Sequence, residues 1–283
     1  MIGRTVVLCA LAMSSACDRP PTQRASGSRS GEGEEARDAA APDPELVRFT
    51  TSDGWQIVGD LRVRRRAGLA VVLVHQLSSN RGEWAAFASQ ISGAQSGRNE
   101  GTISSLAIDL RGHGESITAP DGLTRWQSFG NNRSRWVTLE YDVAAAVDFV
   151  RQRVGTTRIV LVASSIGGTA AALYAARAGA PVAGIVMISP GIEYRGIDVV
   201  APLREFLGRR GRVLLITAAG DTYSADSTRD IEAGLRGDAG SSVEVERYDN
   251  ASAHGVSLGA QGVHPEMWAR IERFVRALDT PRP

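Results

Sequence analysis

Ser165 is the residue of this sequence best placed to act as a nucleophile. It lies in Ala-Ser-Ser-Ile-Gly, residues 163–167, between a β-branched apolar run (159–162) and an alanine-rich helical pattern. A sharp turn from a strand into a helix accepts only small side chains two residues either side of its centre, and it projects the central hydroxyl out of the sheet. Ser165 has alanine and glycine at those flanks, whereas Ser164 would have valine and isoleucine. The spacing therefore predicts Ser165 as the nucleophile.

A serine hydroxyl is a weak nucleophile at its ordinary pKa, so its chemistry requires partners. An imidazole must take the proton as the hydroxyl attacks a carbonyl carbon, and a carboxylate must hold that ring in the correct tautomer. Asp221 and His254 each follow a strand-like run. Ligands of α/β sheets bind outside the carboxyl ends of the strands, so residues at these ends are candidates for the acid and the base.

The elements that must position these residues alternate along the chain. Two strands joined by Ser-Asp-Gly, a hairpin-turn signal, open the series. Strands are predicted at 46–51, 55–63, 69–74, 105–110, 159–162, 182–188, 212–217 and 242–248. Helices are predicted at 82–91 and 138–154, directly after the serine turn, and at 227–235 and 265–278, with an irregular stretch at 117–137. Apolar strands alternating with helices indicate a mostly parallel sheet covered on both faces.

The serine turn and this order of elements resemble the α/β-hydrolase superfamily. The turn is similar to the superfamily's nucleophile elbow, with Ala163 in place of the usual first glycine. The resemblance covers roughly residues 46–278. It implies a single α/β domain with the α/β-hydrolase fold, a mostly parallel central sheet and helices on both faces. The link between the strands at 182–188 and 212–217 is short, so no large lid domain is expected there.

The resemblance also implies a catalytic triad in the chain order serine, acid, histidine. Asp221 then occupies the position of the acid and His254 that of the base, beside Ser165. Asp226 and Glu193 are rival acids, since the family sometimes takes its acid from the earlier strand. His113 lies in Arg-Gly-His-Gly-Glu-Ser, a string common in this family, where the histidine shapes a loop and is not the base.

Two backbone N–H groups are implied as the oxyanion hole, the site that binds the developing negative charge. One belongs to Ile166, which follows the nucleophile. The other belongs to Leu77, by matching the family's His-Gly-x to residues 75–77, His-Gln-Leu. Glutamine in the glycine position is a departure, and it leaves open whether the Gln76 amide also reaches the site.

Gln76, Trp126 and Trp136 are candidates for the substrate pocket, although the two tryptophans are as well explained by pinning their loop to the core. No metal site is predicted, because the sequence has no His-Glu-x-x-His motif and no closely spaced histidines. No cofactor is expected either. All 32 basic residues are arginine, which excludes a lysine nucleophile. The net charge of +1 gives no indication of a nucleic-acid partner.

The N-terminus reads as an export signal. Residues 1–16 combine Arg4 with a short apolar run and a small-residue end, too short to span a membrane. Cys17 follows, and this layout resembles a bacterial lipobox whose cysteine carries lipid; a plain secretory signal is the alternative. Residues 17–45 read as a disordered tether and 46–283 as the hydrolase domain. An exported, membrane-anchored lipoprotein facing the periplasm or the cell exterior is therefore expected.

These inferences converge on a serine hydrolase that cleaves a carboxylic ester or related acyl bond of a small molecule through an acyl-enzyme on Ser165. A peptidase or amidase of the same superfamily would use the same residues. A non-catalytic binding module on this fold is the alternative of a different class.

Overall fold

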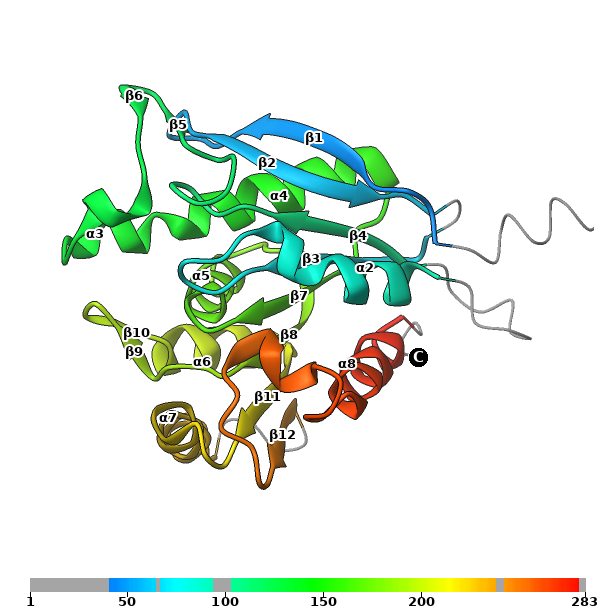
Figure 1. Ribbon diagram of the computed structural model, residues 1–283, viewed down its shortest axis with the longest axis vertical. Helices are drawn as coiled ribbons and strands as arrows, with labels where there is room; N and C mark the ends of the chain where they lie inside the picture. The colour runs from blue at the N-terminus through cyan, green and yellow to red at the C-terminus, as the bar shows by residue number, and fades with distance from the viewer. Residues whose placement is uncertain (1–40, 65–66, 94–102, 238–241, 280–283) are drawn as a thin grey trace, which may run out of the picture. The chain divides into compact units, whose positions relative to one another are not determined.

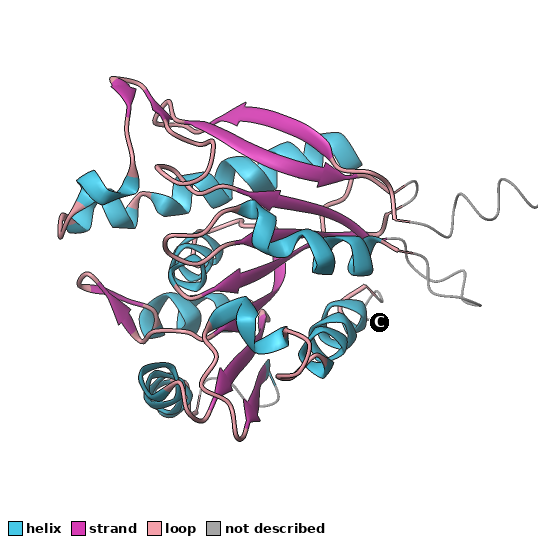
Figure 2. Ribbon diagram, in the orientation of Figure 1, coloured by secondary structure: helices cyan, strands magenta, loops and turns pink. Residues whose placement is uncertain are grey.

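The strands form the framework that positions the site in this computed structural model, which describes residues 41–64, 67–93, 103–237 and 242–279. Ten strands of the described chain form one sheet, and two form a short separate hairpin, β9–β10 (Figures 1 and 2). The strands are β1 Glu45–Thr50, β2 Gln56–Arg62, β3 Leu69–Val74, β4 Ile103–Ile108, β5 Thr118–Ala119, β6 Gly122–Leu123, β7 Ile159–Ser164, β8 Val182–Ile188, β9 Glu193–Tyr194, β10 Ile197–Asp198, β11 Arg212–Ala218 and β12 Val243–Tyr248.

Helices cover this sheet between successive strands. The α-helices are α2 Ala85–Ser92, α3 Arg133–Val137, α4 Leu139–Val154, α5 Ile166–Ala175, α6 Val200–Gly208, α7 Thr222–Gly234 and α8 Glu266–Ala277. Three short 3₁₀ segments of the described chain are η1 Arg81–Trp84, η2 Trp126–Phe129 and η4 Gly255–Gly259. No helix within the described ranges is long and apolar enough to cross a membrane.

The sheet is mostly parallel. Its order is β12-β11-β8-β7-β3-β4-β2-β5-β6, with β1 paired to β2. The pairs from β12 through β4 are parallel, and β2 is antiparallel to both β1 and β4. This arrangement confirms the predicted α/β fold with an antiparallel start.

Alternate residues of the central strands enter two separate apolar layers, because successive side chains of a strand point to opposite faces. In β3, Ala70, Val72 and Val74 pack on the layer that also holds α4, α5, α6 and α7. Leu69, Val71 and Leu73 pack on the other layer, with α2 and α8. Every residue of β3 is fully buried. Burial on both faces explains why this strand reads as apolar throughout in the sequence.

The predicted elements agree with the observed ones most closely in the buried strands. The strands at 69–74 and 182–188 have the predicted bounds. The strand predicted at 105–110 starts and ends two residues earlier, as β4. Helix α6 and the hairpin β9–β10 were missed; they fill the link after β8, which holds no large lid domain. The irregular stretch at 117–137 contains β5, β6, η2 and α3.

Strand β3 is the point at which the sheet reverses its order. The chain passes from β3 to its neighbour β4 on one side and later returns to β7 on the other side. The connections that leave β3 and β7 go to opposite faces, since α2 packs in one layer and α5 in the other. A crevice between such connections, at the carboxyl ends of the strands, is where open α/β sheets bind ligands. The fold therefore directs attention to the loops after β3 and β7.

Candidate active site

Ser165 is the single residue between β7 and α5, and its backbone conformation is strained. Its φ is 50° and its ψ is −119°, a region that residues other than glycine rarely occupy and that costs about 1–3 kcal/mol. Its own N–H donates to the carbonyl of Ile188 at 2.9 Å, and its carbonyl accepts from the N–H of Gly168 at 2.8 Å. These bonds hold the turn, which lifts the Ser165 side chain to a partly exposed position.

Small residues make this turn sterically feasible. Ala163 is completely buried in β7. A Cβ atom on Gly167 would lie 2.6 Å from the carbonyl oxygen of Val74 and 2.7 Å from that of His75. The N-terminus of α5 therefore packs directly on the backbone at the end of β3. Ser164, by contrast, is fully buried, and its hydroxyl lies 3.4 Å from Oε1 of Gln76.

Asp221 and His254 come together at the ends of the neighbouring strands β11 and β12. Nδ1 of His254 lies 2.7 Å from Oδ2 of Asp221. A carboxylate can only accept, so Nδ1 carries the hydrogen and Nε2 is left to accept a proton. Asp221 is 12% exposed and the imidazole 43% exposed. This pair has the geometry of an oriented general base.

Backbone hydrogen bonds fix the two loops that carry this pair. The N–H of Gly220 donates to the carbonyl of Ala251 at 2.8 Å, which ties the acid loop to the histidine loop. The N–H of Gly255, next to His254, donates to the Ser189 hydroxyl at 2.8 Å. The histidine loop is thus anchored to the end of β8, beside the elbow. Within the described residues no hydrogen bond joins the Ser165 hydroxyl to the imidazole.

The rival acids are engaged elsewhere. Asp226 is exposed and pairs with Arg229 one turn further along α7. Glu193 lies on β9, and its Oε1 accepts from the N–H of Gly196 at 3.1 Å. Among the three carboxylates, Asp221 is the one whose side chain meets His254.

The two N–H groups predicted for the oxyanion hole lie on backbone segments that touch. Ile166 is the first residue of α5, where N–H groups lack partners within the helix and the helix dipole is positive. Leu77 follows β3, whose end is in contact with the start of α5 through Gly167. Neither N–H donates to another group in the described part of the chain. An anion between them could be bound by both.

His75 orients the peptide that bears the Leu77 N–H. The N–H of Leu110 donates to Nε2 of His75 at 2.9 Å, so the ring hydrogen is on Nδ1, which lies 2.6 Å from the carbonyl oxygen of Gln76. That carbonyl belongs to the same peptide unit as the Leu77 N–H. Burial lowers the pKa of His75 to about 3, so the ring is neutral at physiological pH.

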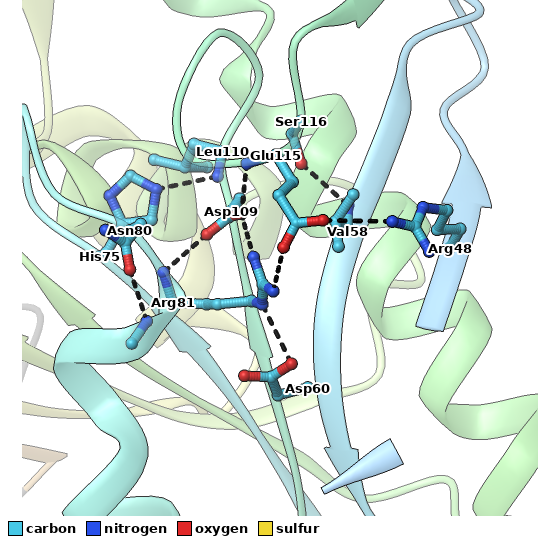
Figure 3. A network of polar contacts seen from close by, with 11 residues as sticks. Arg48, Val58, Asp60, His75, Asn80, Arg81, Asp109, Leu110, Glu115 and Ser116 are labelled. Atoms are coloured by element: carbon cyan, nitrogen blue, oxygen red, sulfur yellow. Dashed lines mark hydrogen bonds and ion pairs between the residues drawn. The ribbon is translucent and has the colours of Figure 1, made fainter. Parts of the chain in front are cut away.

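A charged network supports this histidine from the side of β4, as Figure 3 shows. Asp109, fully buried, accepts from the backbone N–H of Arg81 at 2.7 Å and from its guanidinium at 2.5 Å. The same guanidinium pairs with Asp60 and Glu115. The network joins η1, which follows the loop after β3, to the segment after β4. That segment includes Leu110, whose N–H donates to His75. The network therefore stabilises the loop after β3.

The two tryptophans predicted for the pocket differ in exposure. Trp136 is 2% exposed and packs in the core between Phe129 and Tyr194, with its indole N–H donated to Gly130. Its assignment to the substrate pocket is therefore corrected: the residue pins its loop to the core, which the sequence had left open. Trp126 is partly exposed and stacks on His113, the buried histidine predicted to shape its loop.

A cavity of about 400 Å³ is lined by residues that include Trp55, Arg111, Phe129 and Arg135. Neither Ser165 nor the Asp221–His254 pair is among the described residues that line it. The lining charges cancel when Asp53 and Asp121 are included. Gln76, the remaining pocket candidate, lies against Ser164 and close to Gly255, at the elbow itself.

Metal-binding side chains do not gather at this site. Across the described ranges, no group of three or more His, Cys, Asp or Glu residues is arranged to hold a metal ion. The contact that the described residues do make here is the one between the His254 imidazole and the Asp221 carboxylate.

Solved structures similar to this chain include several hydrolases. An esterase of Pyrococcus furiosus has a TM-score of 0.64 at 16% identity, covering 86% of this chain and 93% of its own. A thermostable carboxyl esterase of Bacillus coagulans has 0.62 at 13%, covering 85% and 100%. A dienelactone hydrolase of Anabaena variabilis has 0.57 at 19%, covering 84% and 97%. At these identities the likeness shows the fold.

The sequence itself identifies the family. No curated protein is significantly similar to it. Residues 70–228, more than half of the chain, match the family model described as the alpha/beta hydrolase fold. The chain therefore belongs to the α/β-hydrolase fold family.

Proposed function

We propose that this chain is a serine hydrolase that cleaves a carboxylic ester or related acyl bond of a small molecule. The observation that carries the proposal is the 2.7 Å contact of His254 with Asp221, at the same edge of the sheet as the strained Ser165. The similar folds of the esterases and the dienelactone hydrolase support this class of substrate.

In the proposed reaction the Ser165 oxygen attacks the carbonyl carbon while Nε2 of His254 takes the hydroxyl proton. Asp221 holds the ring and stabilises the imidazolium. The N–H groups of Leu77 and Ile166 bind the oxygen that becomes negative. Collapse of the tetrahedral intermediate breaks the bond to the alcohol, which leaves with the proton from His254. Water, activated by the same imidazole, then releases the acid from Ser165.

The first experiment compares Ser165→Ala with the wild type on p-nitrophenyl esters of increasing acyl length. We expect turnover to fall by at least about a thousandfold, because only binding and oxyanion stabilisation would remain. Labelling by a fluorophosphonate probe should be lost with it. Activity equal to the wild type would refute the mechanism. Activity on aminoacyl amides but not on esters would favour the peptidase, and failure of the probe to label the wild type would favour a binding module.

A matched pair of variants tests the choice of acid. Asp221→Asn removes the carboxylate bonded to His254 and should lower kcat by about 10⁴-fold, since the ring loses its orienting partner. Asp226→Asn changes an exposed carboxylate of the same segment, paired with Arg229, and should leave kcat within about twofold. Equal effects of the two changes would contradict the assignment of Asp221.

We also propose that the chain is exported and attached to a membrane by lipid on Cys17. The support is the sequence of residues 1–17, which lie outside the described residues.

A further inference from the structure

Glu83 is a buried acid that the proposed reaction does not use. It lies on η1, directly after the loop that follows β3. Its Oε1 accepts the backbone N–H of Gln76 at 3.2 Å, and the Ser79 side chain favours the ionised form of the carboxyl group. Its Oε2 is buried and has no hydrogen-bond partner among the described residues. The buried carboxyl group of Glu83 therefore contacts the backbone of this loop.

This loop carries the Leu77 N–H, and its backbone needs support. Ser78, the next residue, has a φ of 61°, in the left-handed region that non-glycine residues seldom adopt. His75 holds the peptide between Gln76 and Leu77 through its carbonyl, while Glu83 holds the preceding peptide through its N–H. The two bonds act on consecutive peptides, so together they set the direction of the Leu77 N–H.

No cationic side chain in the described ranges forms an ion pair with Glu83. Arg81, on the same helical turn, directs its guanidinium to Asp109, Asp60 and Glu115 (Figure 3). His75, on the adjoining loop, is neutral. Beyond the Gln76 side chain lies the His254 loop, where His254 is paired with Asp221. Burial outweighs the opposing effects of the Ser79 side chain and the Gln76 N–H, and it raises the pKa of Glu83 to about 7.

An ionised Glu83 would oppose the proposed chemistry. Its carboxyl group contacts the N–H of Gln76, one residue from Leu77, so it lies within about 10 Å of the oxyanion position. Two negative charges at this separation repel each other appreciably in a partly buried site. A neutral carboxyl group keeps an oxygen that can accept the Gln76 N–H but carries no such charge.

We propose that Glu83 is a positioning residue of the hydrolase, whose neutral carboxyl group holds the Leu77 loop in the geometry that binds the oxyanion. The inference rests on the proposed function. It assigns Glu83 a dependence of turnover on pH.

The test measures kcat and KM of the wild type, Glu83→Gln and Glu83→Ala on one short-chain ester by pH-stat titration between pH 6 and 9. Glutamine keeps the acceptor and is always neutral. We expect kcat of the wild type to fall about tenfold relative to Glu83→Gln as the pH rises above 7, with KM unchanged. Glu83→Ala should lower kcat at every pH, because the Gln76 N–H loses its partner. Asp226→Asn is the matched control and should follow the wild-type profile.

The outcomes separate this inference from the proposed function. An active wild type that loses activity in Ser165→Ala establishes the hydrolase; if Glu83→Gln then shows the wild-type pH profile, the role of Glu83 is overturned alone. A wild type that hydrolyses no ester or amide overturns both. Circular dichroism of each variant checks that it is folded, and Glu83→Gln, as the conservative change, decides the matter if Glu83→Ala does not fold.

Discussion

Ser165 and Asp221 of the proposed triad are held by different local constraints. The backbone of Ser165 is strained, and the hydrogen bond from its N–H to the carbonyl of Ile188 holds it in that conformation. Asp221 sits just before α7 with its side chain turned to His254, although a residue at this position usually caps its own helix. In each case a local preference gives way to the site. Such departures are where functional residues are expected.

The raised pKa of Glu83 predicts a pH dependence of stability that does not require activity. The unfolded chain releases this proton near pH 4.5, whereas the folded chain keeps it to about pH 7. The free energy of unfolding therefore falls as the pH rises through this window, by up to about 3 kcal/mol. In urea unfolding, Glu83→Gln should exceed the wild type in stability at pH 8 and differ far less at pH 5. A difference that is the same at both pH values would contradict the burial of an ionisable group here.

A functional residue can be predicted from the sequence when its side chain suits catalysis and it follows a strand that the sequence pattern predicts. Asp221 and His254 follow runs that predict strands, so both could be selected before the 2.7 Å contact was known. Glu83 could not be selected, because its burial depends on how η1 packs under a loop of another element. The role of Trp136 stayed open between the pocket and the core for a similar reason: an aromatic residue in an irregular stretch gives no indication of which side it faces. Burial of a side chain between two elements depends on how those elements pack, so a local sequence pattern does not predict it.

At the scale of elements, the elbow depends on how closely α5 approaches β3. The contact of Gly167 with two backbone carbonyls leaves no room for a side chain, and backbone atoms cannot turn aside as a flexible side chain can. Gly168 faces the end of the Met187 side chain instead, and a Cβ atom added at Gly168 would lie 2.9 Å from the terminal carbon of that side chain. The two glycines are therefore unequal, although they are adjacent in the sequence.

A pair of substitutions tests this inequality. Gly167→Ala should displace the elbow from β3 and destabilise the domain by about 1–3 kcal/mol, with a loss of turnover, because the overlap is with backbone. Gly168→Ala should cost less, since Met187 can adopt another rotamer. Thermal unfolding and ester hydrolysis measure the two effects. An equal loss of stability in both variants would show that the backbone contact does not determine the turn.

The same scale shows why some elements were predicted and others were missed. Strands β3 and β8 are apolar runs bounded by polar or small residues, so their bounds were right. Helix α6 contains Pro202 and follows a two-strand hairpin, and its buried face is set by Leu203, Phe206 and Leu207. With three apolar residues on one face and a proline near its start, its pattern is short and easily missed beside the longer helices.

At the scale of the whole molecule, the chain enters the sheet at the amino ends of the parallel strands, whereas the proposed site lies at their carboxyl ends. Strand β1 is antiparallel to β2, which is antiparallel to β4, so β1 runs in the direction of the parallel strands. Its first residue, Glu45, therefore lies at their amino edge, while Ser165 and the Asp221–His254 pair lie at the carboxyl edge. Figure 1 shows β1 starting on the side away from α3 and the hairpin β9–β10. A link through the N-terminus would leave the carboxyl edge open to substrate.

This separation gives the last prediction, which concerns the proposed anchor. Cys17→Ala should abolish incorporation of labelled palmitate and move the protein from the membrane fraction to the soluble fraction of an expressing bacterium. Its kcat on a water-soluble ester should stay within about twofold of the wild type, because the attachment acts at the edge remote from Ser165. Cys9→Ala, a change within the predicted signal, is the matched control and should keep both the label and the membrane location. Retention of Cys17→Ala in the membrane would refute lipid attachment at this residue, and a large fall in its kcat would contradict the independence of the two ends.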